Sequence, residues 1–267
     1  MSTVTSTLPT LDVSGTSPVP FGRLIGVELR KMADTRAGRW LLISIAALTA
    51  LVLAIQLAVI LANDLPVDFR DFMIAMNTPM GVLLPVLGIM SVTSEWSQRT
   101  AMVTFSLEPS RSRLILAKFA STMLIAVVAV VIGLSLSVAA NLLYGALSGN
   151  PVVWDIGAMD VGFYFLLHAI GMATGFAFGT LFLNTAVAIV IYFVYSFVLP
   201  GLFQLGAQLM NWFADIQPWI DFSAAQNALI AGDVDGEQWA QLGVSGFIWL
   251  VLPLAVGLWR VLRAEVK

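Results

Sequence analysis

The sequence predicts an all-α, polytopic membrane protein with six transmembrane helices, and three observations lead to that fold class. The chain of 267 residues is 59% hydrophobic and only 11% charged, with a mean hydropathy of +0.91, whereas soluble domains carry about 25% charged residues. The apolar residues gather in long segments, and the basic residues gather between alternate segments. A length that would suit one or two soluble domains is therefore distributed over membrane helices.

Six apolar segments are long enough to cross a bilayer, whose hydrocarbon core requires about 20 helical residues. The fourth and fifth segments are separated only by the polar pair Asn184-Thr185. One helix over both segments would be too long for any bilayer, so we expect a tight turn at this pair. The expected spans are 41–62, 73–94, 115–145, 160–183, 186–207 and 241–260.

The charges predict that both termini lie in the cytoplasm, because basic residues are retained on that side. Six spans place 12 of the 13 basic residues inside and leave only Arg70 outside, whereas an odd number of spans would spoil this partition. Ten of the 16 acidic residues then lie in the outer loops. The inner basic residues are Arg23, Arg30, Lys31, Arg36, Arg39, Arg99, Arg111, Arg113, Lys118, Arg260, Arg263 and Lys267.

The first 20 residues contain no Lys or Arg, are rich in Ser, Thr and Pro, and lack the apolar core of a secretory signal peptide. We expect a disordered tail over 1–20 and one membrane domain over 21–267. Within that domain, residues 21–39 precede the first span and have an apolar helical face, which predicts an amphipathic helix in the cytosolic interface. That face contains Phe21, Leu24, Ile25, Leu29 and Met32.

Glu28 falls on the apolar face of this interfacial helix, where a lone carboxylate is unfavourable. Two interpretations remain open. The carboxylate pairs with a basic residue of the polar segment 95–118, or it extends to the lipid headgroups.

The polar segment 95–118 separates the second and third spans. It begins with a Glu-aromatic-x-x-x-Thr element, and a leucine, a proline, an arginine and a lysine follow in that order. The matching residues are Glu95, Trp96, Thr100, Leu107, Pro109, Arg111 or Arg113, and Lys118.

This order resembles the cytosolic coupling segment of ABC-2 type transporter permeases. The resemblance implies a coupling helix between spans 2 and 3 that contacts two cytosolic ATPase subunits, and short re-entrant helices in the outer region 208–240. The mild departure is Gln98-Arg99, where a basic residue and glycine are frequent. A simpler alternative makes Glu95 and Arg99 an i,i+4 helix pair. The implied coupling residues are Glu95, Trp96, Arg99, Thr100, Leu107, Pro109, Arg111, Arg113 and Glu28.

The resemblance also implies that one six-span chain is half of a transport pathway, so a second permease, identical or paralogous, is expected in a bacterial plasma membrane. None of the three lysines follows a glycine, as a phosphate-binding loop requires. We therefore expect Mg-ATP to bind in the partner ATPase and no cofactor in this chain. The chain has no cysteine, and no metal, catalytic or nucleic-acid-binding pattern is evident. We expect a transport subunit rather than an enzyme.

Two stripes at helical spacing are candidates for the substrate path, because flexible Met and broad aromatic side chains suit varied apolar ligands. In ABC-2 relatives the second and fifth spans border that path, whereas ordinary packing is the alternative. The stripes comprise Met73, Met76, Asn77, Met80 and Leu84 on the second span, and Tyr192, Tyr195, Ser196, Leu199 and Phe203 on the fifth. From these we select Met76, Asn77, Met80, Tyr195, Leu199 and Phe203.

Two further features lie in the fourth span. His168 is the only histidine. An ionisable group within a span is a candidate functional residue, but we favour the structural interpretation, in which it bonds to a neighbouring carbonyl or hydroxyl group. Gly171, Gly175 and Gly179 form a small-residue ridge that lets another helix approach closely, within the chain or in a dimer.

The expected function is export of an apolar or amphipathic substrate such as a drug, lipid or peptide. The alternatives are a membrane anchor or sensor that does not transport, and a membrane-embedded enzyme.

Overall fold

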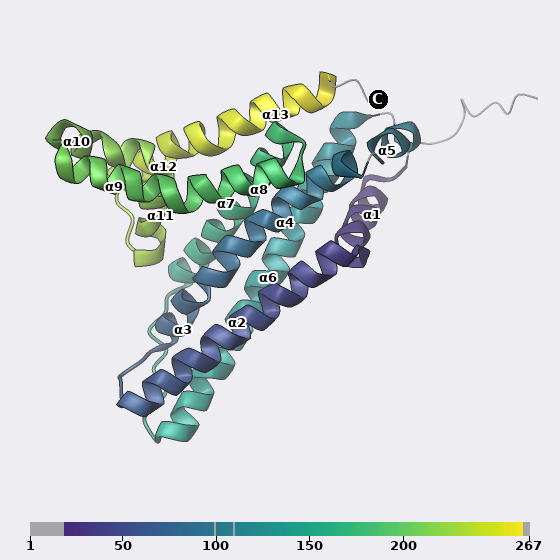
Figure 1. The fold of residues 1–267 in the computed structure, drawn as a ribbon. Coiled ribbons are helices and arrows are strands. Elements are labelled where there is room, and N and C mark those ends of the chain that lie inside the picture. Colours follow the sequence, from purple (N-terminus) through teal and green to yellow (C-terminus); the bar gives the residue numbers. More distant parts are fainter. Residues whose placement is uncertain (1–18, 99, 109, 264–267) are drawn as a thin grey trace, which may run out of the picture.

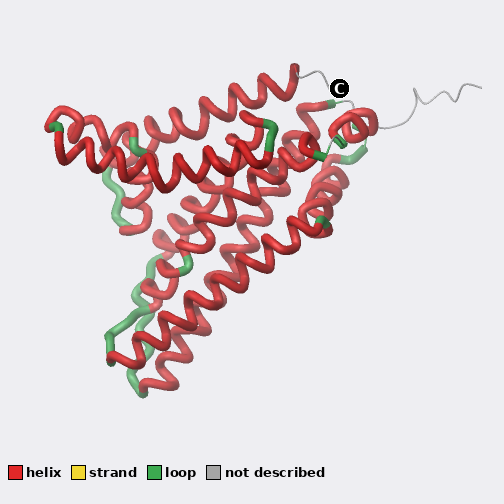
Figure 2. The backbone as a smooth tube through the Cα atoms, in the orientation of Figure 1, coloured by secondary structure: helices red, strands yellow, loops and turns green. Residues whose placement is uncertain are grey.

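The computed structural model describes residues 19–98, 100–108 and 110–263. Within these residues the chain is helical throughout and contains no strand, and six helical segments are long and apolar enough to cross a membrane. The predicted all-α fold with six spans is confirmed (Figures 1 and 2). The expected tail over 1–20 falls almost entirely outside the described residues. The six segments are Arg36–Asn63, Phe69–Ser97, Arg111–Ser148, Ala158–Phe182, Thr185–Leu209 and Gly236–Arg263.

The interfacial segment and the first span are two separate helices, α1 (Phe21–Asp34) and α2 (Arg36–Asn63). Thr35 has extended backbone angles, and its hydroxyl accepts a hydrogen bond from Gly38 N at 3.2 Å. This cap satisfies a free amide at the start of α2. The helix expected over 21–39 is therefore divided at Thr35, and residues 36–39 extend the first span.

The second span is divided at Met76 into α3 (Phe69–Ala75) and α4 (Asn77–Ser97). Pro79 explains the division, because a proline ring clashes with the carbonyl four residues earlier, here that of Ala75. Pro85 lies inside α4 and leaves the Gly81 carbonyl without its helical partner. The Tyr192 hydroxyl from the fifth span donates to that carbonyl at 3.5 Å.

A short helix, α5 (Ala101–Leu107), connects the second span to the long third span, α6 (Arg111–Ser148). The fourth span, α7 (Ala158–Phe182), ends at Leu183, which has a left-handed backbone. Asn184 then caps the fifth span by accepting from Val187 N at 3.1 Å. The tight turn expected at Asn184-Thr185 is present.

The fifth and sixth spans each contain a π-helical segment. The fifth comprises α8 (Thr185–Phe193), the π segment Val194–Val198 and α9 (Leu199–Leu209). The sixth comprises α12 (Gly236–Gly246), the π segment Phe247–Val251 and α13 (Leu252–Arg263). Pro200 and Pro253 each stand two residues after the last residue of the π segment, and a proline removes a helical bond that the wider π turn accommodates. Between the two spans lie the short helices α10 (Asn211–Ile220) and α11 (Phe222–Ala231).

The centre of the fold is the contact between α4 and α7. A side chain at Gly175 would overlap the carbonyl oxygen of Pro85, and a Cβ at Gly179 would lie 2.9 Å from the carbonyl oxygen of Ile89. The glycine ridge of the fourth span therefore serves packing within the chain. By contrast, only 11% of the most apolar window of the fifth span is buried, so that helix offers a face to lipid or to another protein.

The described ends of the chain lie at the same end of the molecule as α5 (Figure 1). Arg113 donates to the carbonyl of Val19 at 2.7 Å, and Arg111 donates to the carbonyls of Val261 and Leu262, both at 3.2 Å. At the opposite end, Arg70 pairs with Asp160 at 3.5 Å and donates to the carbonyl of Ile230 at 3.1 Å. The one basic residue expected outside thus joins α3, α7 and the end of α11.

Candidate functional site

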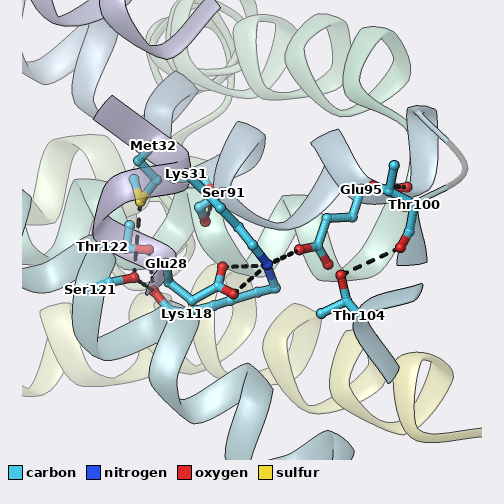
Figure 3. Close-up of polar contacts among 11 residues, drawn as sticks. Glu28, Lys31, Met32, Ser91, Glu95, Thr100, Thr104, Lys118, Ser121 and Thr122 are labelled. Carbon is cyan, nitrogen blue, oxygen red and sulfur yellow. Dashed lines mark hydrogen bonds and ion pairs between the residues drawn. The ribbon is translucent and has the colours of Figure 1, made fainter. Parts of the chain in front are cut away.

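Four charged side chains form a closed ring beside α5, at the end of the bundle that holds both described chain ends (Figure 3). Lys31 Nζ lies 2.8 Å from Glu28 Oε1 and 2.8 Å from Glu95 Oε1. Lys118 Nζ lies 2.6 Å from Glu28 Oε2 and 2.9 Å from Glu95 Oε1. Each charge has two opposite neighbours, and we call Glu28, Lys31, Glu95 and Lys118 the ionic ring.

The ionic ring joins three helices, because Glu28 and Lys31 lie on α1, Glu95 on α4 and Lys118 on α6. Glu28 is 3% exposed and Lys118 is 5% exposed. A buried charge is costly unless it is paired and hydrogen-bonded, and the ring meets this condition with two positive and two negative groups. Of the two interpretations of Glu28, the structure has the ion pair, and its partner in the polar segment is Lys118.

Lys31 is the most exposed member of the ionic ring, with 39% of its side chain accessible. Burial by itself lowers the pKa of Lys31, but hydrogen bonds and charge attraction from Glu28 and Glu95 outweigh it and raise the pKa above the ordinary 10.5. The ammonium form is therefore favoured in the folded protein at any physiological pH. The carboxylates of Glu28 and Glu95 each face both lysines, and of these Lys118 is nearly out of contact with water.

The start of the polar segment 95–118 is tied directly to the ionic ring. The Thr100 amide donates to the carbonyl of Glu95 at 2.9 Å, and the Thr104 hydroxyl donates to the carbonyl of Thr100 at 3.4 Å. Trp96, also on α4, packs in a cluster with Val92 and Phe176. A cavity of about 300 Å³ lies between the ring and α5, with Val103 and Thr104 among its lining residues.

The remaining predicted coupling residues are distributed differently. Arg111 and Arg113 bind backbone carbonyls near the two ends of the chain, and Arg113 also pairs with the buried Glu108 at 3.5 Å. Leu107 ends α5. Arg99 and Pro109 lie outside the described residues.

Sequence reasoning missed the role of Lys31, which it named only among the basic residues of the inner side. The available signal was its spacing, because residues three apart on a helix are neighbours. Lys118 carried a second signal, as a lone lysine three residues after the expected start of the third span.

A second cavity, also of about 300 Å³, lies between α4, α7, the fifth span and α11. We call it the outer cavity, because its α4 residues belong to the half of the second span that lies farther from α5. Three of the predicted pathway residues line it, namely Asn77, Met80 and Tyr195. The full lining is Asn77, Thr78, Met80, Gly81, Val82, Leu84, Pro85, Leu167, His168, Gly171, Thr174, Tyr192, Tyr195, Ser196, Phe197, Ser223, Gln226, Asn227 and Ile230.

The other three predicted pathway residues are not among the residues that line the outer cavity. Met76 is fully buried in the core and accepts a hydrogen bond on sulfur from Ser137 of α6 at 3.7 Å. Phe203 packs against Phe213 of α10 with ring centroids 5.9 Å apart. Leu199 is the first residue of α9, half-buried beside the π segment. The stripe on the second span is therefore shared between the core and the cavity wall, whereas Leu199 and Phe203 of the other stripe belong to neither.

His168 lies on the wall of the outer cavity and is 3% exposed. Its Nδ1 is 2.9 Å from the carbonyl oxygen of Tyr164, as the structural interpretation expects. Because a carbonyl only accepts, Nδ1 carries the proton and Nε2 keeps a free lone pair. This Nε2 is buried and has no hydrogen-bond partner among the described residues. The structural interpretation therefore accounts for only one of the two imidazole nitrogens.

Comparison with known proteins supplies a family. No curated protein matches the chain. The family described as ABC-2 family transporter protein matches residues 41–230, from the first span to α11. The match covers α4, α5 and all but the α1 members of the ionic ring, together with the whole lining of the outer cavity. The chain is a membrane protein, with six candidate spans among its described residues, and it belongs to the ABC-2 transporter family.

Proposed function

We propose that this protein is the membrane-spanning permease subunit of an ATP-driven exporter. It moves an apolar or amphipathic substrate out of the cytoplasm, and two separate ATPase subunits bind and hydrolyse Mg-ATP. A second permease, identical or paralogous, completes the pathway against the exposed fifth span. The protein lies in a bacterial plasma membrane with both termini and α5 in the cytoplasm, which agrees with the 12-to-1 partition of basic residues.

The observation that carries this proposal is the link between α5 and the ionic ring. α5 exposes two apolar side chains, Met102 at 54% and Val103 at 60%, which suit a protein partner. Directly behind it, the Glu95 backbone caps the segment and the Glu95 side chain joins the ring. A push on α5 by an ATPase therefore reaches α4, α1 and α6 together.

The second span carries this displacement across the membrane. Glu95 and Asn77 lie at opposite ends of α4, and Asn77 lines the outer cavity. The hydrogen bond of Tyr192 to Gly81, whose carbonyl Pro85 leaves free, links α4 to the fifth span on the cavity wall. In this mechanism a shift of α4 changes the cavity and alternates its access between the two sides.

The test is co-purification of the cytosolic ATPase with this chain, together with the ATPase rate of the complex. Met102→Glu with Val103→Glu places two charges on the exposed face of α5. We expect this double variant to insert normally but to lose most of the bound ATPase and its stimulation, because charges disfavour an apolar contact. Asp233→Lys, an exposed change beyond α11, is the matched control and should behave as the wild type.

An unchanged yield and an unchanged rate in the double variant would contradict docking at α5. If the ATPase binds and is stimulated but reconstituted vesicles show no ATP-dependent transport of any tested amphiphile, the protein is an anchor or sensor rather than an exporter.

A further inference from the structure

The outer cavity is polar without being charged. Ten of its lining side chains have hydrogen-bonding groups, and none of the residues that line it is Asp, Glu, Lys or Arg. Leu84, Leu167, Phe197 and Ile230 supply apolar surface beside them. The ten are Asn77, Thr78, His168, Thr174, Tyr192, Tyr195, Ser196, Ser223, Gln226 and Asn227.

Several of these polar groups are unused. The structure gives the side chains of Asn77, Ser223 and Asn227 no hydrogen bond to any described residue, and His168 Nε2 is buried without a partner. In the hydrocarbon region water is absent, and an unsatisfied polar group costs several kcal/mol unless it faces a water-filled or ligand-filled space. Asn77 and His168 lie within the second and fourth spans, so the cavity must supply their partners.

The acids on elements that border the cavity are already engaged. Asp221 caps α11 by accepting from Ala224 N at 3.0 Å, and it accepts from Gln217 at 3.3 Å. Asp160 pairs with Arg70 at 3.5 Å and accepts from Gly157 N at 2.8 Å. A cation in the cavity would have no free carboxylate to replace its water, and an anion would have no free basic side chain.

Building on the proposed function, we propose that the outer cavity binds the uncharged, hydrogen-bonding group of an otherwise apolar substrate, namely an amide or a hydroxyl group. Asn77 and Asn227 each offer both a donor and an acceptor, which matches a primary amide in both directions. His168 Nε2 only accepts, so it selects a group that also donates an N–H or O–H. The apolar side chains hold the adjoining hydrocarbon part of the same molecule.

The test uses three photoreactive probes with the same decyl chain and diazirine but different headgroups: a primary amide, a trimethylammonium and a carboxylate. The whole permease–ATPase complex is labelled in nanodiscs, and the labelled peptides are identified by mass spectrometry. The amide probe should label peptides from α4 and α11 at least tenfold more than either charged probe. Asn77→Ala and Asn227→Ala should each reduce this labelling about threefold to tenfold, the effect of one lost hydrogen bond.

Asn63→Ala makes the same chemical change at the end of α2, away from the cavity, and should leave labelling unchanged. If Asn77→Ala fails to fold, Asn227→Ala and Ser223→Ala on the exposed side of α11 decide the result. Equal labelling by a charged probe, or Asn variants that label like Asn63→Ala, would overturn the proposal.

The ATPase rate of the same samples separates this proposal from the proposed function. If the ATPase rate is stimulated normally but labelling is equal for all three headgroups, the neutral-ligand site is refuted and the proposed exporter function is not. Selective, Asn-dependent labelling without any stimulation refutes the exporter and leaves the binding site standing.

Discussion

The ionic ring and the outer cavity lie at the two ends of α4, and they differ in how their polar side chains are satisfied. The ionic ring borders a cavity of about 300 Å³, and the outer cavity has about the same volume. Glu95 and Asn77 stand about 27 Å apart at 1.5 Å per helical residue. At the ring every group is charged and every charge is paired. At the outer cavity the groups are neutral and several are unpaired. Paired charges hold helices together, whereas unpaired neutral groups remain available to a ligand.

The largest expected effect comes from breaking the ionic ring. Glu28→Ala removes the carboxylate that bridges both lysines and leaves Lys118 buried with only Glu95. Removing one partner of a buried pair typically costs about 3 to 5 kcal/mol. We expect a loss of that order in the free energy of unfolding, measured by thermal or denaturant unfolding in nanodiscs.

The matched control is Asp34→Ala, which removes an exposed carboxylate from the last turn of the same helix and should change the free energy of unfolding by less than about 0.5 kcal/mol. Equal stability of the two variants would show that the ring is not a structural element. In that case the paired charges at the Glu95 end of α4 would not be what holds the helices together.

The next effect tests whether α4 is a fixed link between the two sites. Gly175→Ala places a methyl group against the carbonyl oxygen of Pro85, where α7 and α4 touch. Overpacking of this kind typically costs about 1 to 3 kcal/mol, and we expect a matching decrease in the free energy of unfolding. Gly162→Ala, near the start of the same helix, meets no atom within 4 Å and should be neutral or slightly stabilising.

A similar result for both glycine variants would mean that α4 and α7 separate easily. The ionic ring and the outer cavity could then move independently, and a shift of α4 could not serve both sites.

The spans were predictable because bilayer thickness and backbone hydrogen bonding leave few solutions. Apolar length predicts the six helices, and the Asn184-Thr185 pair predicts the turn between α7 and α8, where Asn184 caps the new helix. The glycine ridge predicts close packing, although only the structure identifies α4 as its partner. These features depend on the local sequence and on the lipid environment, and both can be inferred from a single sequence.

The two sites were predictable only in part, because each combines residues far apart in the sequence. Glu28 was predicted to need a basic partner, but the choice of Lys118 depends on how α1 lies against α6. The predicted stripes contain Asn77 and Tyr195, which line the outer cavity, yet α7 and α11 complete the wall of that cavity. Helical periodicity alone does not show that Met80 lines the outer cavity and Met76 does not, since both are buried and fall on one face of an interrupted span.

The smallest expected effect is the pH dependence of the ionic ring, which sharpens the contrast with the uncharged cavity. The pKa of Lys31 is raised above its ordinary 10.5, so the folded protein holds this proton more tightly than the unfolded chain does. The resulting stability is fully present below pH 10.5 and is lost as the pH rises through the folded pKa. We expect a decline in the unfolding temperature above about pH 10.5 that is steeper in the wild type than in Lys31→Met.

Arg30→Met is the control for this pH series, because it removes a neighbouring charge on α1 that does not titrate in this range. Its unfolding temperature should follow the wild-type slope, and the tyrosines contribute equally to all three proteins. The difference should be modest, since 39% of the Lys31 side chain is in contact with solvent and exposed pairs are screened. Parallel curves for Lys31→Met and the wild type would mean that the Lys118 pairs alone hold α1 to the bundle. The ion pairs of Lys31 would then be present in the structure without contributing to its stability.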